Sequence, residues 1–134
     1  MQQREGKSGG IGLSNALAGL AVLSRTQKNA RIHAAATIAV AVLGGLLPLS
    51  ASEWTWIVLA VGIVWMGEAL NTAIELLADA AVPQWHPLVG RAKDVAAGGV
   101  LLSAATAAVI GTLVLGPHVL GLITAVGGST FSGS

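Results

Sequence analysis

Apolar residues fill three stretches of this chain, each long enough to cross a membrane as a helix. The first is His33–Leu49, the second is Trp54–Val82, and the third runs from Asp94 or Val95 to about Leu115. We expect Gly116-Pro117 to end the third stretch, because proline lacks the amide hydrogen that continues a helix. The pattern therefore predicts an all-α integral membrane protein with three transmembrane helices.

The second stretch differs from the others because polar side chains repeat along one face of its helix. At about 100° per residue, four of them fall within an arc of roughly 100°. We call these four the polar stripe: Glu68, Asn71, Glu75 and Asp79. A carboxylate costs free energy in hydrocarbon, so such a stripe should face a protein interior and bind an ion, a proton or a substrate. The helix would be about 43 Å long, against a hydrocarbon core of roughly 30 Å, which puts Glu68 deepest and Asp79 near water.

A shorter apolar segment, Ile11–Leu23, precedes the first span. Three leucines share one face of a helix there: Leu13, Leu17 and Leu20. This spacing predicts an amphipathic helix on the membrane surface. A signal peptide is disfavoured, because Arg25, Lys28 and Arg31 follow and would hinder translocation. We therefore divide the chain into a flexible N-terminus (1–12), a membrane domain (13–116) and a C-terminal tail (117–134).

Composition and charge place any chemistry at the membrane. Hydrophobic residues make up 54% of the 134 residues and charged residues 10%, whereas soluble domains are roughly 25% charged. With no cysteine in the chain, disulfides and thiolate chemistry are excluded. The seven basic residues lie before the first span and between the second and third: Arg4, Lys7, Arg25, Lys28, Arg31, Arg91 and Lys93. The positive-inside rule then predicts a multi-pass protein of the bacterial inner (cytoplasmic) membrane, with its N-terminus cytoplasmic.

The nucleotide-binding motifs of soluble enzymes are missing. Gly6-Lys7-Ser8 resembles the end of a P-loop, but Met1 occupies the position of the first glycine. The three histidines stand far apart in sequence, and we interpret His33 and His86 as interfacial polar residues rather than metal ligands. Small residues recur at every fourth position at Gly99, Ser103, Ala107 and Gly111, which indicates close helix packing.

A second charged cluster, Arg91, Lys93 and Asp94, lies where the cytoplasmic loop enters the third span. A helix start with basic side chains suits phosphate, although taken alone these residues could be only topology determinants and an N-cap. Together with the polar stripe, they allow phosphoryl transfer at a membrane through a divalent metal and a carboxylate base. They equally allow a cation or proton pathway.

The residues Glu68-Ala-Leu-Asn71-Thr-Ala-Ile-Glu75 and Arg91-Ala-Lys93-Asp94-Val-Ala-Ala-Gly98 resemble the small prokaryotic diacylglycerol kinase/undecaprenol kinase family. Arg31-Ile-His33 and the segment 14–20 are similar to its N-terminal half, so the resemblance covers about residues 13–116. It implies an ATP- and Mg²⁺-dependent lipid kinase with three transmembrane helices and a surface helix. It also implies a homotrimer whose active sites form between neighbouring subunits.

The resemblance also implies roles for individual residues. Glu68 matches the catalytic base and Asn71 its polar neighbour at the lipid substrate. Glu75 matches a metal ligand that also contacts the nucleotide. The remaining nucleotide contacts would be Arg31, Lys93 and Asp94. Gln27 stands where the family usually has a second metal-binding glutamate, and an uncharged ligand there should lower the affinity for magnesium.

The acceptor lipid leaves little trace in a sequence. Arg31-Ile-His33 and Ala92–Gly98 are closer to the undecaprenol kinase branch, so undecaprenol is favoured over diacylglycerol. The alternative is a non-enzymatic or degenerate membrane bundle, acting as an ion pathway or a partner subunit, which Gln27 alone supports. No feature of the sequence indicates nucleic-acid binding.

Overall fold

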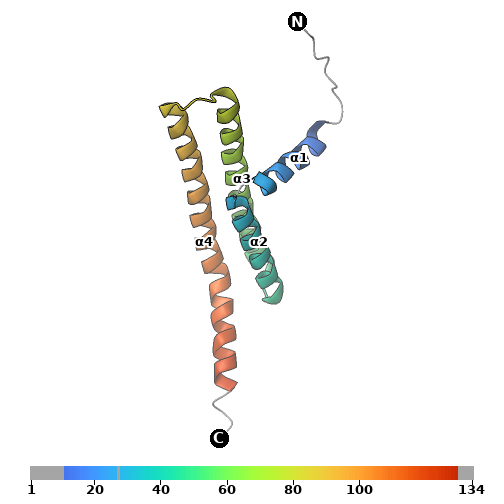
Figure 1. Ribbon diagram of the computed structural model, residues 1–134. Coiled ribbons are helices and arrows are strands. Elements are labelled where there is room, and N and C mark those ends of the chain that lie inside the picture. Colours follow the sequence, from blue (N-terminus) through green and yellow to red (C-terminus); the bar gives the residue numbers. More distant parts are fainter. Residues whose placement is uncertain (1–10, 27, 130–134) are drawn as a thin grey trace.

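The computed structural model describes residues 11–26 and 28–129, and these form four α-helices (Figure 1). They are α1 (Ile11–Thr26), α2 (Lys28–Leu46), α3 (Ala51–Ala81) and α4 (Pro87–Ser129). Three stretches are long and apolar enough to cross a membrane: Asn29–Leu46, Ala51–Ala81 and Pro87–Gly127. The prediction of an all-α chain with three such helices is therefore confirmed. An amphipathic role for α1 stays a prediction.

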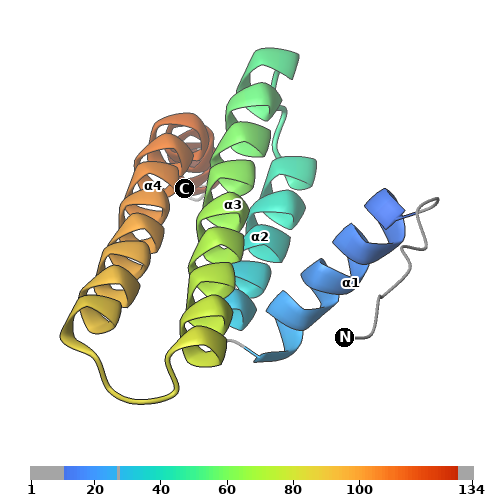
Figure 2. The ribbon, with the colours of Figure 1, turned by 90° about the horizontal axis from the view of Figure 1, so that it is seen from above.

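Helix α3 lies between α2 and α4, while α1 is set at an angle beside the other three (Figures 1 and 2). Its buried residues recur every three or four positions along one side: Ile57, Ala60, Val64, Glu68, Asn71 and Thr72. This is the spacing of one helix face. The apolar seam of the bundle thus continues without interruption into the polar stripe, whose first two members are turned towards the protein.

Helices α3 and α4 approach each other closely at Gly67. A Cβ atom added at Gly67 would lie 2.9 Å from Ser103 Oγ, a distance that real Cβ atoms essentially never show. Ser103 itself is held in place, because its hydroxyl donates to the carbonyl oxygen of Gly99 at 2.8 Å. The predicted packing role of the small-residue positions on α4 is therefore confirmed at Ser103. Two later members, Ala107 and Gly111, instead line a cavity described below.

The N-terminal end of α3 is stabilised by a capping box. Ser50 Oγ accepts from the backbone N–H of Glu53 at 3.3 Å, and Glu53 Oε2 accepts from the N–H of Ser50 at 2.7 Å. Such reciprocal bonds satisfy amide groups that a helix start leaves without partners. Glu53 Oε1 also lies 2.7 Å from Nε2 of His118 on α4. This pair joins the start of α3 to the second half of α4.

Both predicted limits of the third span were wrong. Helix α4 begins at Pro87 rather than at residue 94 or 95, and it continues through Pro117 to Ser129 instead of ending at Gly116-Pro117. Proline suits the first turn of a helix, which explains the early start. Pro117 removes only one backbone hydrogen bond, and the apolar residues after it favour helix because a membrane offers no other backbone partners. The predicted tail is thus helical to residue 129.

The limits of the first span also differ from the prediction. Helix α2 runs from Lys28 to Leu46, whereas His33–Leu49 was predicted. Its N-terminal turn is polar, so hydropathy alone placed the start too late. The division at residues 12 and 116 into tail and domain stays a prediction. Residues 1–10 lie outside the described part of the chain.

Candidate functional site

The polar stripe begins at the most buried large side chain of the described chain. Glu68 is 1% exposed and Asn71 is 6% exposed. Glu75, one turn further along α3, is half-buried, and Asp79 at the end of the stripe is exposed. Burial of the stripe therefore decreases towards the α3–α4 loop. A carboxyl group at the buried end is shielded from bulk water, while those at the other end can meet soluble molecules.

Buried polar atoms without hydrogen bonds gather at this buried end. Within the described residues, neither carboxylate oxygen of Glu68 makes a hydrogen bond, and the same holds for Asn71 Oδ1 and Thr72 Oγ1. Imidazole Nε2 of His33 lies 3.1 Å from Glu68 Oε1, which is ion-pair distance, but the N–H is not aligned for a hydrogen bond. Since buried polar groups are nearly always satisfied, this cluster should meet a ligand, water or a second chain.

The outer half of the stripe is organised by two side-chain contacts. Asn71 Nδ2 donates to Glu75 Oε1 at 3.2 Å, and this leaves Asn71 Oδ1 as an acceptor. Lys93 Nζ donates to Asp79 Oδ1 at 2.7 Å and so brings the second charged cluster against the stripe. Because both partners are exposed to solvent, this pair contributes little to stability. Its consequence is to place one cation at the accessible end of the stripe, beside Asp79 and near Glu75.

Between described residues, no hydrogen bond or ion pair joins Arg31 or Asp94 to the stripe. Arg31 on α2 and Asp94 on α4 are both exposed. Gln27 lies outside the described residues, so its predicted role as a metal ligand stays a prediction. Among the residues that the structure describes, no three His, Asp or Glu side chains gather closely enough to hold a metal ion.

The oxygen donors of the stripe nevertheless fit magnesium in kind. Mg²⁺ is bound through one or two carboxylates together with substrate phosphates and water, rather than by a full cage of protein ligands. Glu75 has a carboxylate at the accessible half of the stripe, beside the buried Oδ1 of Asn71. A magnesium site that takes most of its ligands from phosphate oxygens and water needs only one or two oxygen ligands from one chain.

His33 is the site residue that sequence reasoning missed. We interpreted it as an interfacial polar residue, yet its ring lies against Glu68 on the neighbouring helix. One turn later, Thr37 accepts a hydrogen bond from Trp65 Nε1 at 3.1 Å and donates to the carbonyl oxygen of His33 at 2.7 Å. The signal was present in the spacing, because His33 and Thr37 share a face of α2 while Trp65 and Glu68 share a face of α3.

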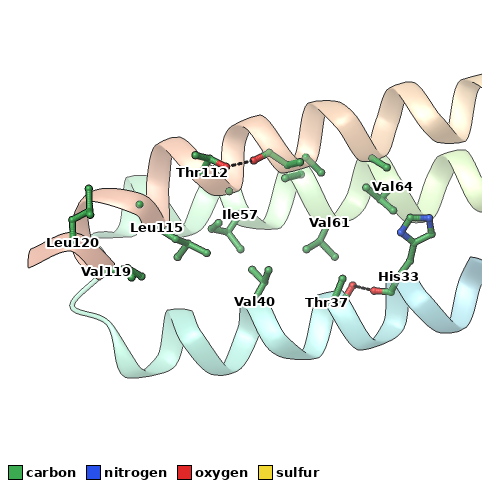
Figure 3. A pocket seen from close by; sticks show the side chains of 17 residues that line it. His33, Thr37, Val40, Ile57, Val61, Val64, Thr112, Leu115, Val119 and Leu120 are labelled. Atoms are coloured by element: carbon green, nitrogen blue, oxygen red, sulfur yellow. Dashed lines mark hydrogen bonds between the residues drawn. The ribbon is translucent and has the colours of Figure 1, made fainter. Parts of the chain in front are cut away.

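His33 also stands at one end of an apolar cavity of about 770 Å³ between α2, α3 and α4. Figure 3 shows its ring at one end of the cavity and Val119 and Leu120 at the other, with Val40 and Val61 between them. The cavity therefore runs from His33, the neighbour of the buried Glu68 carboxylate, along the apolar part of the bundle. Such a space suits an aliphatic group attached to a polar head.

A sequence model described as prokaryotic diacylglycerol kinase matches residues 14–115, about three quarters of the chain. The chain belongs to the prokaryotic diacylglycerol kinase family. The resemblance seen in the sequence is therefore confirmed, and with it the expectation of a lipid kinase, an enzyme that transfers phosphate to an alcohol group. This family and the three long apolar helices together indicate a multi-pass membrane protein.

Two proteins to which this chain is similar carry different names. The undecaprenol kinase of Bacillus subtilis (strain 168) is 44% identical over 94 residues, covering 70% of this chain and 76% of the relative. The diacylglycerol kinase of Synechocystis sp. is 40% identical over 109 residues, covering 81% of this chain and 62% of the relative. The match thus spans less than two thirds of the Synechocystis protein.

Proposed function

We propose that this chain transfers the γ-phosphoryl group of ATP to the hydroxyl of a membrane lipid alcohol, with undecaprenol favoured over diacylglycerol. The observation that carries this proposal is Glu68, a buried carboxylate to which no described residue makes a hydrogen bond, next to His33 at the end of an apolar cavity. A lipid alcohol has a hydroxyl group on an aliphatic tail. The hydroxyl suits the carboxylate and the tail suits the apolar cavity. The preference for undecaprenol rests on Arg31-Ile-His33 and on the relative of that name at 44% identity.

In this proposal Glu68 is the base. The hydroxyl of the lipid gives its proton to the Glu68 carboxylate, its oxygen bonds to the γ-phosphorus, and ADP leaves with the bridging oxygen. Asn71 lies on the same helix face and would line the substrate-binding position next to Glu68. Lys93, Arg31 and Asp94 would contact the nucleotide, with the two cations offsetting phosphate charge.

Magnesium would be held by Glu75, with Gln27 as a second, uncharged ligand, together with phosphate oxygens. When bound, the ion neutralises charge on the phosphates during transfer. Glu75 suits this role better than Glu68, because it lies on the accessible half of the stripe while Glu68 is buried.

The proposal includes a homotrimer with sites between subunits. Its support is the cluster of buried polar atoms that the described part of one chain leaves without hydrogen bonds. A neighbouring chain could supply those partners and further ligands. The mass of the purified protein in detergent, measured by light scattering, should correspond to three chains, and a monomeric mass with full activity would contradict this assembly.

The deciding experiment is a phosphoryl-transfer assay on the purified chain. With [γ-³²P]ATP and magnesium, we expect label to enter undecaprenol faster than diacylglycerol when both are presented in the same mixed micelles. Equal or reversed rates would overturn the preference for undecaprenol but would still support the proposed kinase activity. No labelled lipid with either acceptor, from a protein that still trimerises, would favour the non-enzymatic alternative.

The orientation gives a separate prediction. The start of α2 points towards the same end of the bundle as the α3–α4 connection, so the helix starts that carry Arg31, Arg91 and Lys93 lie on one side (Figure 1). We propose that this side is cytoplasmic. A reporter in the Pro83–Gly90 loop should then read as cytoplasmic, and one at the C-terminus as periplasmic or extracellular. The opposite pattern would separate the stripe from ATP and contradict the proposed site.

A further inference from the structure

His33 contacts the one carboxylate that the bundle buries almost completely. Its Nε2 atom lies 3.1 Å from Oε1 of Glu68, and the His33 side chain is itself 16% exposed. Within the described residues, no hydrogen bond reaches either oxygen of Glu68. His33 is therefore the described polar side chain positioned to compensate this buried carboxylate.

A second contact between the same helices holds His33 where it is. Trp65 Nε1 on α3 donates to Thr37 Oγ1 on α2, and Thr37 donates in turn to the carbonyl oxygen of His33. Trp65 precedes Glu68 by about one turn, and His33 precedes Thr37 by about one turn. The two contacts are thus neighbouring polar contacts between α2 and α3. Together they restrain both the rotation and the sliding of α2 relative to α3, which keeps the backbone of His33 opposite Glu68.

The imidazole that approaches Oε1 of Glu68 also lines the apolar cavity. His33 lies on the cavity wall, and the aliphatic part of a lipid alcohol would enter from the same space. A carboxylate free to rotate would present either oxygen to the hydroxyl at varying angles. A carboxylate held at Oε1 presents Oε2 in one orientation, and catalytic groups lose rate steeply when their geometry is loose.

We propose that His33 is a positioning residue for phosphoryl transfer, holding Oε1 of Glu68 so that Oε2 receives the proton of the lipid hydroxyl. This inference rests on the proposed function. The hydroxyl O–H bond breaks and its proton goes to Oε2, while the hydroxyl oxygen bonds to the γ-phosphorus and the bond from that phosphorus to the ADP oxygen breaks. His33 neither gains nor loses a proton in this step.

The test compares His33→Ala and His33→Gln with a control histidine, His86→Ala, which removes an exposed side chain in the α3–α4 loop. We expect His33→Ala to lower kcat about tenfold with little change in the KM for ATP, since a catalytic group that loses its positioning contact loses rate steeply. His33→Gln keeps an N–H donor at a similar reach and should recover part of the rate. His86→Ala should leave kcat unchanged.

A double-mutant cycle separates positioning from a merely structural role. If His33 acts through Glu68, His33→Ala should cause no further loss of turnover in a Glu68→Gln background. A structural role would lower turnover and thermal stability equally in both backgrounds, and that result would overturn the inference. So would unchanged kcat in His33→Ala.

A readout without activity keeps this inference distinct from the proposed function. The infrared band of the Glu68 carboxyl group is identified by its loss in Glu68→Gln. We expect that band to shift in His33→Ala and to stay in place in His86→Ala. An unshifted band would overturn the contact itself. If the band shifts but the unsubstituted chain labels no lipid, the proposed function fails, and the role of His33 in transfer fails with it while the contact stands.

Discussion

Glu68→Gln is expected to lower the turnover of lipid phosphorylation by roughly a hundredfold or more, while binding of magnesium–ATP survives. Glutamine keeps the shape of the side chain and its reach towards His33, but its amide cannot accept the hydroxyl proton. The residue is 1% exposed, so solvent cannot readily take over as the base. Single-turnover transfer from [γ-³²P]ATP and equilibrium binding of a nucleotide analogue measure the two effects separately.

The same variant has a stability signature. Replacing a buried carboxylate by a neutral amide removes the cost of holding a charge away from water, so the thermal midpoint of Glu68→Gln should not fall. This makes loss of activity through unfolding easy to recognise. Glu68→Asp is the companion variant, because it keeps the charge but withdraws it by one methylene. Near-normal turnover of Glu68→Gln with either lipid would contradict the proposed base and advance the non-enzymatic alternative.

Glu75→Gln is expected to raise the magnesium concentration for half-maximal activity by about tenfold, because a charged ligand of a hard cation becomes neutral. The fold should tolerate this change, since Glu75 is only half-buried and the Asn71 amide can still donate to the new side-chain oxygen. With saturating magnesium, much of the turnover should return. Titration of activity and of nucleotide binding against magnesium provides the measurement.

A matched control lies at the other end of the same helix. Glu53→Gln makes the same chemical change, far from the stripe, and it disturbs the capping box and the contact with His118. We expect it to lower the thermal midpoint without moving the magnesium dependence. If Glu53→Gln shifts the magnesium dependence as much as Glu75→Gln does, the effect is a general loss of stability and Glu75 is not a metal ligand.

The sequence by itself was sufficient to predict the three membrane-spanning helices, the polar stripe and the family. Three apolar stretches and a 3.6-residue period are local properties of a chain, and a membrane leaves helices as the main way to satisfy the backbone. The repeat from Glu68 to Asp79 gave the face of α3 that carries polar groups. The motifs around the stripe and Lys93 were specific enough for the family, although the exact helix ends were not, as Pro117 shows.

Contacts between helices were decided only by the tertiary structure. Hydropathy describes one helix at a time and cannot say which residue of α2 meets Glu68. That choice depends on how far α2 slides along α3, which the bond between Trp65 and Thr37 sets, and this is why His33 was mistaken for an interfacial residue. The bonding of Lys93 to Asp79 likewise depends on the path of the loop between α3 and α4. The close approach at Gly67 follows from side-chain volume, because only the missing Cβ leaves room for Ser103.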